Sequence, residues 1–180
     1  MGKRRWHRKT AAALVDGAFH VLGRAASHLP MSRPALHGVE VDRGLRYLGG
    51  SDPAHLVDIY RPTDTAGSLP VVLYVHGGGF RALSRETHWL MGLAFARAGF
   101  LVFSVDYRLA PAHPYPAAIS DVCAAYRWVT ERAPTYGGDP RRIVVSGESA
   151  GANLVTSLTL CTTYEREEPW TRAAWDTGIV

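Results

Sequence analysis

The sequence predicts an α/β protein built on a largely parallel β-sheet. Short runs of β-branched and aromatic residues, typical of strands buried on both faces, recur at 71–75, 100–105 and 143–145. Stretches with helical spacing of apolar residues separate these runs. Strands that alternate with helices in this way require crossover connections between parallel neighbours.

Two further strands and three helices are expected around these runs. Loose alternation over 39–48 and an apolar run at 55–60 predict the strands, and the second ends at Arg61-Pro62 because proline cannot donate to a β-ladder. The helices are expected from Ser84 or Thr87 to Gly99, over 119–129, and from Ala150 to the acidic cluster at 165–168.

The first 38 residues differ from the rest and divide the chain into segments 1–38 and 39–180. Apolar residues recur at helical spacing over 10–29 and predict an amphipathic helix that packs on the domain or lies on a surface. Asp16, His20 and Arg24 interrupt this stretch, which argues against a signal peptide or a membrane span.

Positive charge is concentrated in the same segment. Of the 20 basic residues in the chain, five lie among the first nine: Lys3, Arg4, Arg5, Arg8 and Lys9. The other 15 (20 − 5) face 16 acidic residues, so the formal net charge of +4 comes from a tail and not from a surface. A solvated terminus is the simplest interpretation, and contact with a membrane surface is the alternative. We expect no nucleic-acid partner.

The composition is that of an ordinary soluble globular protein, with 47% hydrophobic and 20% charged residues. Cys123 and Cys161 stand singly within predicted helices, which indicates neither a disulfide framework nor a metal site. We therefore expect a cytoplasmic protein without a metal ion.

Ser149 is the first candidate catalytic residue. The segment Gly147-Glu148-Ser149-Ala150-Gly151 matches G-x-S-x-G between a predicted strand and a predicted helix. A sharp turn there would expose the serine as a nucleophile, and the two flanking glycines must be small because such a turn presses them together. The following helix would direct its free N–H groups at a developing oxyanion.

A glycine run after the 71–75 strand supplies the second candidate element. In His76-Gly77-Gly78-Gly79-Phe80, consecutive glycines let the backbone approach a ligand and turn amide hydrogens toward it. For acyl transfer these amides would stabilise the tetrahedral oxyanion, at about 3–4 kcal/mol per donor. His76 is expected to brace the loop and not to act as a base.

The same run also fits a dinucleotide-binding fingerprint, a different functional class. Residues 77–82 satisfy G-x-G-x-x-A after a strand, and Asp106 ends the next strand. That function needs a helix that opens directly on the glycines to bind pyrophosphate. Here the apolar helical run starts only near Trp89, which argues against it.

Together the motifs resemble the hormone-sensitive-lipase-like branch of the α/β-hydrolases. The resemblance covers about residues 55–158 and rests on four segments in family order: 76–80, 106–111, 113–118 and 147–151. It implies an α/β-hydrolase fold and a cofactor-free hydrolase for a small-molecule acyl ester. Ser149 would be the nucleophile, and the amides of Gly78, Gly79 and Ala150 the oxyanion hole.

The resemblance also implies supporting roles for several other residues. His76, Gly77, Gly147 and Gly151 would shape the two loops, and the N-terminal helix would contribute to a cap over the acyl pocket. Asp106 and Arg108 would tie the loop after the 100–105 strand, where a buried ion pair is expected instead of catalysis. Ala112 departs from the family pattern, which usually has glutamate there, at the cost of one loop contact.

The acid and the base of the catalytic triad are missing from their expected place. In this fold both follow the serine, whereas all eight histidines precede Ser149. We expect a truncated chain that lacks the C-terminal strands and hydrolyses esters weakly or not at all. The alternatives are a non-catalytic small-molecule-binding protein, or an enzyme that recruits His88 or His113. Without a further strand, the 143–145 strand would form an open edge that invites dimerisation.

Overall fold

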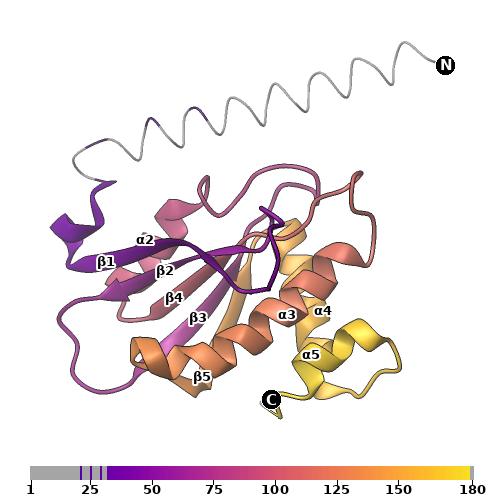
Figure 1. Ribbon diagram of the computed structural model, residues 1–180. Helices are drawn as coiled ribbons and strands as arrows, with labels where there is room; N and C mark the ends of the chain where they lie inside the picture. The colour runs from indigo at the N-terminus through magenta and orange to yellow at the C-terminus, as the bar shows by residue number, and fades with distance from the viewer. Residues whose placement is uncertain (1–20, 22–24, 26–28, 30–31, 179–180) are drawn as a thin grey trace.

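The structure is a computed structural model that describes residues 21, 25, 29 and 32–178 (Figure 1). The predicted basic tail and most of the helix at 10–29 lie outside the described residues. The elements follow one another as η2 (Pro34–His37), β1 (Val39–Arg46), β2 (Leu56–Pro62), β3 (Leu69–Val75), α2 (Trp89–Arg97), β4 (Leu101–Val105), α3 (Ala117–Arg132), η3 (Ala133–Tyr136), β5 (Gly138–Gly147), α4 (Ala150–Thr163), η4 (Pro169–Thr171) and α5 (Arg172–Trp175).

The strands form one five-stranded sheet in the order β1-β2-β4-β3-β5. β3 runs parallel to both β4 and β5, with Val72 opposite Val102 on one side and Val144 on the other. β2 pairs antiparallel with β1 and β4. The predicted α/β class with parallel strands is therefore confirmed, and the end of β3 lies beside the end of β5.

Helices cover both faces of this sheet (Figure 1). Val71, Leu73 and Val75 face the larger core, which they share with α3, α4 and α5. Val72 and Tyr74 face the opposite way and pack against α2 in a smaller core. This alternation is the period of a strand that is buried on both faces, so the helical layers follow directly from the 71–75 run.

β5 differs from the prediction of a third buried strand at 143–145. Val144 is 50% exposed, and Ile143 and Val145 are only partly buried. The reason is position: β5 is the last strand of the sheet within the described residues and has a partner only on the β3 side. The prediction of a strand here was correct, and so was the open edge expected in the absence of a further strand, whereas the burial expected from the apolar run was wrong.

The final predicted helix is also shorter than expected. α4 ends at Thr163, because Tyr164 adopts an extended conformation with φ −130° and ψ 126°. The chain then turns through η4 into the short α5, which packs against α3 and α4. This return brings Trp170 close to the start of α3, where it contacts Tyr115 with a ring separation of 6.3 Å.

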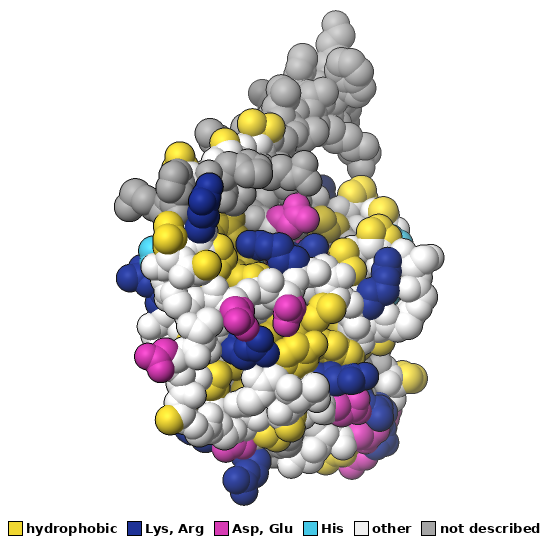
Figure 2. Space-filling view, turned by 60° about the vertical axis from the view of Figure 1, so that its left-hand side comes forward, with side chains coloured by type: hydrophobic (Ala, Val, Ile, Leu, Met, Phe, Trp, Pro, Cys, Tyr) yellow, Lys and Arg dark blue, Asp and Glu magenta, His cyan; other side chains and the backbone are white. Residues whose placement is uncertain are grey.

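Basic and acidic side chains are interspersed on the face of the molecule in Figure 2, with apolar side chains between them. Among the described residues, no helix is both long enough and apolar enough to cross a membrane. Nor does the described part of the chain contain a cluster of three or more metal-ligating side chains.

Candidate active site

Ser149 lies in the turn between β5 and α4. Its backbone has φ 51° and ψ −114°, a region that residues with a side chain rarely adopt and that costs on the order of 1–3 kcal/mol. Ser149 is exposed, and its carbonyl accepts the first helical hydrogen bond from Asn153 N at 3.1 Å. The strained turn therefore presents the serine to solvent at the N-terminus of α4.

The glycines on either side of Ser149 allow this turn to approach the end of β3. A Cβ on Gly151 would lie 2.1 Å from the carbonyl oxygen of Val75, and a Cβ on Gly147 would lie 2.7 Å from the carbonyl carbon of Gly151. Both positions are thus closed to any side chain. The amide of Gly151 donates to the carbonyl of Glu148 at 2.8 Å, which closes the turn.

The glycine loop follows β3 and lies beside the serine turn. Gly78 has φ +115°, and a Cβ there would lie 1.9 Å from the carbonyl oxygen of Ala82. Gly79 has φ +62° and is exposed. Within residues 32–178, the amides of Gly78, Gly79 and Ala150 donate no hydrogen bond to another backbone group. These three N–H groups are therefore free to bind an external acceptor.

His76 joins the loop to the protein interior. Its ring is buried, and Nδ1 lies 2.7 Å from the carbonyl oxygen of Gly77, so this nitrogen carries the proton and donates. The ring stacks on Tyr107 with 4.4 Å between centroids, and the Tyr107 hydroxyl donates to the His76 carbonyl at 3.0 Å. His76 therefore holds the first turn of the glycine loop from within.

A buried charge cluster supports the chain that follows the glycine loop. The Arg85 guanidinium pairs with Asp58 at 2.9 Å and with Asp106, and the Arg85 amide donates to Asp106 at 2.6 Å. Burial raises the pKa of Asp106, although Arg85 opposes that rise. Burial opposes ionisation of Arg85 as well, yet the two carboxylates raise its pKa overall. The cluster thus anchors the β3–α2 connection beneath the loop.

Asp106 and Arg108 have different partners. Arg108 binds Asp121 of α3 through Nε at 2.9 Å and through Nη2 at 2.6 Å, whereas Asp106 binds Arg85. Both are structural ion pairs, and neither joins the two residues to each other. Arg85 could not be singled out from the sequence, because it lies in a loop of mixed polar residues.

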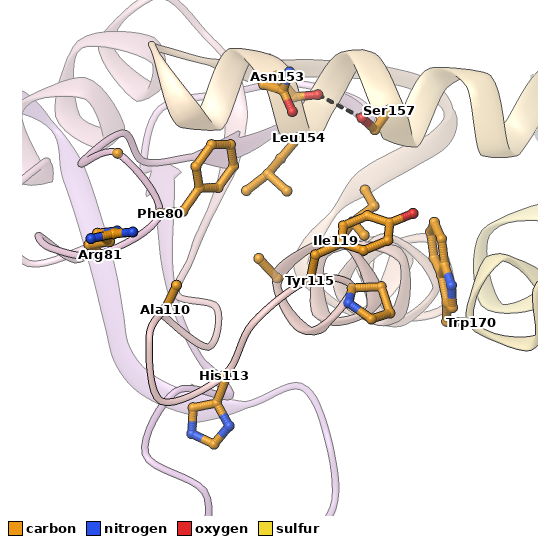
Figure 3. Close-up of a pocket in the computed structure, with 13 residues that line it drawn as sticks. Phe80, Arg81, Ala110, His113, Tyr115, Ile119, Asn153, Leu154, Ser157 and Trp170 are labelled. Carbon is orange, nitrogen blue, oxygen red and sulfur yellow. Dashed lines mark hydrogen bonds between the residues drawn. The ribbon is translucent and has the colours of Figure 1, made fainter.

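A pocket of about 420 Å³ opens next to the glycine loop (Figure 3). Apolar side chains, among them Phe80, Leu154 and Trp170, form most of its wall, while Asn153 and Ser157 present polar groups from α4. Ser149 is not a lining residue and lies one helical turn before Asn153. The lining residues are Gly79, Phe80, Arg81, Ala110, His113, Tyr115, Pro116, Ala118, Ile119, Asn153, Leu154, Ser157 and Trp170.

Neither candidate histidine is arranged as a base for Ser149. Both ring nitrogens of His88 are engaged: Nδ1 lies 2.9 Å from the carbonyl oxygen of Ser84, and Nε2 lies 2.5 Å from Glu148. His113 is an exposed loop residue in the pocket lining. The dinucleotide alternative also lacks its required geometry, because α2 begins only at Trp89, well beyond the glycines.

Comparisons with known proteins place this geometry in a family. A family model for the alpha/beta hydrolase fold matches residues 72–174, more than half of the chain. Carboxylesterase NlhH of Mycobacterium tuberculosis is 52% identical over 99 residues, which are 54% of this chain and 31% of the relative. Carboxylic ester hydrolase LipN of the same organism is 40% identical over 126 residues, 69% of this chain and 32% of the relative.

The solved structures agree with these sequence relatives. Esterase LipW from Mycobacterium marinum superimposes with a TM-score of 0.70 and 35% identity, over 85% of this chain and 48% of the esterase. The chain thus spans about a third of those curated relatives and about half of that solved one, so its α/β-hydrolase fold is incomplete by comparison. The chain belongs to the α/β-hydrolase family, in the hormone-sensitive-lipase-like branch that its motifs resemble.

Proposed function

We propose that this chain carries the nucleophile and the oxyanion hole of a serine carboxylic ester hydrolase. The observation that supports this most directly is Ser149, exposed in a strained strand-to-helix turn whose flanking glycines leave no room for side chains. Its relatives include a carboxylesterase, an esterase and a lipase. The substrate would be a small-molecule acyl ester, and no cofactor takes part.

The chemistry assigns a role to each loop. The Ser149 hydroxyl oxygen attacks the ester carbonyl carbon, and the carbonyl oxygen becomes an oxyanion. The amides of Gly78, Gly79 and Ala150 donate to this oxyanion, because no backbone acceptor in the described part of the chain competes for them. When the carbonyl re-forms, the alcohol leaves with a proton, and water later releases the acyl group from the serine.

The pocket would receive the apolar arm of the ester. It begins at Gly79 and Phe80 of the glycine loop and extends along Asn153 and Ser157 of α4 to Trp170. A rise of about 1.5 Å per residue puts Ser157 about 12 Å along the helix from Ser149. Its size and its apolar wall with a few polar groups are typical of small-molecule sites.

Turnover by this chain alone is expected to be weak or absent. The hydroxyl proton of Ser149 needs a base, and His88 is fully engaged elsewhere. No histidine follows Ser149, where this fold normally supplies the base, and we propose that the triad acid and histidine are not among these 180 residues. An oxyanion hole without a base retains only part of the rate enhancement.

Labelling with a fluorophosphonate tests this function. We expect covalent labelling at Ser149 that is slow but stoichiometric, and no labelling in Ser149→Ala. Ser68→Ala is the matched control, because it removes a hydroxyl from an exposed loop position outside both the pocket and the serine turn. Equal labelling of Ser149→Ala and wild type would contradict the proposal, as would labelling at a different serine.

A second candidate function is ligand binding without turnover. The well-formed pocket, together with the engaged ring of His88, favours it. Calorimetry with the carboxylate and the alcohol of a p-nitrophenyl acyl ester series separates the two functions. Saturable binding with no labelling of Ser149 would support a binding protein, and labelling of Ser149 would support the hydrolase.

A further inference from the structure

His88 and Glu148 meet next to the proposed nucleophile, although 60 residues separate them in the chain. His88 precedes the first residue of α2, and Glu148 precedes Ser149. The imidazole Nε2 lies 2.5 Å from the carboxylate Oε1, with the histidine side chain 11% exposed and the glutamate side chain 53% exposed. The pair thus connects the start of α2 to the serine turn, and its histidine ring is largely buried.

The surroundings of the ring determine where its protons must be. Nδ1 lies 2.9 Å from the carbonyl oxygen of Ser84, which can only accept, so Nδ1 carries a proton. Thr87 Oγ1 lies at the same distance, but it already donates its own proton to that carbonyl at 2.7 Å. With Nδ1 protonated, a neutral ring would direct the Nε2 lone pair at a carboxylate. The contact therefore requires one further proton between Nε2 and Glu148.

Other groups around the ring do not replace this proton. The His76 ring stacks on His88 with 5.6 Å between centroids, but its own Nδ1 donates to Gly77. The ring of Tyr74 from β3 lies 6.2 Å away between centroids, tilted by 42°. On the segment that leads to His88, Arg85 and Glu86 interact with each other, and Arg85 also pairs with buried carboxylates. Glu148 is thus the acidic partner of His88.

Glu148 also contacts both loops of the candidate site. A Cβ on Gly77 would lie 3.0 Å from the Glu148 carbonyl oxygen and 3.2 Å from its Cγ, so the glutamate packs directly on the glycine loop. The same carbonyl accepts the amide of Gly151 at 2.8 Å. One residue therefore touches the glycine loop, the serine turn and the start of α2.

We propose that His88 and Glu148 form a positioning pair that fixes the serine turn against the glycine loop through one shared proton. When alkali removes that proton, a lone pair faces a carboxylate and the contact is lost. When acid adds a second proton, an oxygen of the protonated Glu148 carboxyl can still accept a hydrogen bond from Nε2–H, so the contact weakens less. The catalytic meaning of the pair rests on the proposed function, whereas the contact itself does not.

The isotope-labelled 180-residue chain and its variants test the pair by NMR. When the pH is varied, we expect the amides of Gly78, Gly79 and Ala150 to shift in the same step as the His88 ring. In Glu148→Gln that shared step should be lost, because the new amide donates to a neutral Nε2 and keeps the contact without the extra proton. Glu131→Gln, which alters the exposed Arg127–Glu131 pair, is the matched control and should keep the step.

His88→Phe removes the contact at every pH. We expect its three amides to differ from wild type throughout the titration, and any fluorophosphonate labelling of Ser149 to slow by about 10- to 100-fold. If this variant does not fold, Glu148→Gln decides alone. The proposal would be overturned if the chemical shifts of the three amides did not change together with those of the His88 ring. It would also be overturned if the shared step were still observed in Glu148→Gln. If the shared step occurs in wild type and is lost in Glu148→Gln, but Ser149 is never labelled, the hydrolase function is rejected and the positioning pair still stands.

Discussion

β3 and β5 are parallel neighbours, and each leads into one half of the candidate site. β3 is enclosed: Val71, Leu73 and Val75 have no exposed surface, and β4 and β5 cover its two sides. Within residues 32–178, β5 has one partner strand, and its Val144 is half exposed. The glycine loop is therefore held by the core, whereas the serine turn depends on contacts with β3 and on Glu148.

The two halves of the candidate site are held in place by different parts of the molecule. The amides of Gly78 and Gly79 follow the interior strand β3, and the chain after them is anchored by a buried charge cluster, so their positions are built into the stable part of the molecule. Ser149 and the amide of Ala150 follow β5, whose outer edge is open within residues 32–178. Substitutions in the two regions should therefore have effects of different size on stability and association, and four experiments measure these effects.

The largest effect is expected from Arg85→Met. The change leaves Asp58 and Asp106 buried without their common cation, and breaking a buried pair in this way costs about 3–5 kcal/mol. Urea denaturation measures the loss in the free energy of unfolding. Arg127→Met removes an exposed pair with Glu131 and should cost about 1 kcal/mol or less. Equal losses would mean that the buried cluster does not anchor the loop.

Leucine-to-alanine and valine-to-alanine changes compare the strands directly. Leu73→Ala in β3 removes a fully buried side chain, and we expect a loss of about 2–5 kcal/mol. Val144→Ala in β5 removes a half-exposed one and should cost about 1 kcal/mol or less. Thermal or urea unfolding of both variants gives the ratio. A loss in Val144→Ala as large as in Leu73→Ala would show that β5 is covered in solution.

Alkaline pH should destabilise the smaller core, which Tyr60 of β2 shares with Val72 and Tyr74 of β3. Burial raises the pKa of Tyr60 to about 12, so the folded state keeps the proton that the unfolded chain loses near pH 10. Stability is therefore fully present below pH 10 and falls as pH rises to about 12, by about 2–3 kcal/mol for this group. Tyr60→Phe should fall less steeply than wild type in urea titrations at each pH. Tyr164→Phe, at an exposed position, should match wild type.

The smallest effect on stability, about 0.5 kcal/mol or less, is expected from Val144→Lys. We propose that the open edge of β5 pairs with a second copy, and a lysine on an edge strand discourages such pairing. Sedimentation velocity should show self-association in wild type and less of it in the variant. Thr156→Lys, on the exposed surface of α4, is the control for added charge. A wild-type chain that stays monomeric at high concentration would contradict this partner.

Much of the fold was readable from local pattern. The runs at 71–75 and 100–105 correspond to β3 and β4 within two residues at each end, because a strand buried on both faces needs continuous apolar residues. The glycines at 147 and 151 also indicated a tight turn, because a side chain at either position would collide with the backbone. Such features depend on neighbours in sequence.

Features that depend on distant partners could not be predicted. Arg85 contacts Asp106 across 21 residues and Asp58 across 27, and an arginine in a polar loop carries no local sign of such burial. The run of β-branched residues at 143–145 indicated burial, and the open edge that exposes Val144 was expected only from the missing further strand, not from the run itself. The contact of His88 with Glu148 likewise required the fold to bring two segments together.

Trp170 gives the pocket a property that makes it experimentally accessible. Its indole stands edge-on to Tyr115 in the pocket wall, so an occupant would change the environment of a natural fluorophore. Emission from the unlabelled chain, with Trp170→Phe subtracted to remove the other four tryptophans, would then report occupancy during a titration. Ligands could be screened optically in this way whether or not the serine reacts.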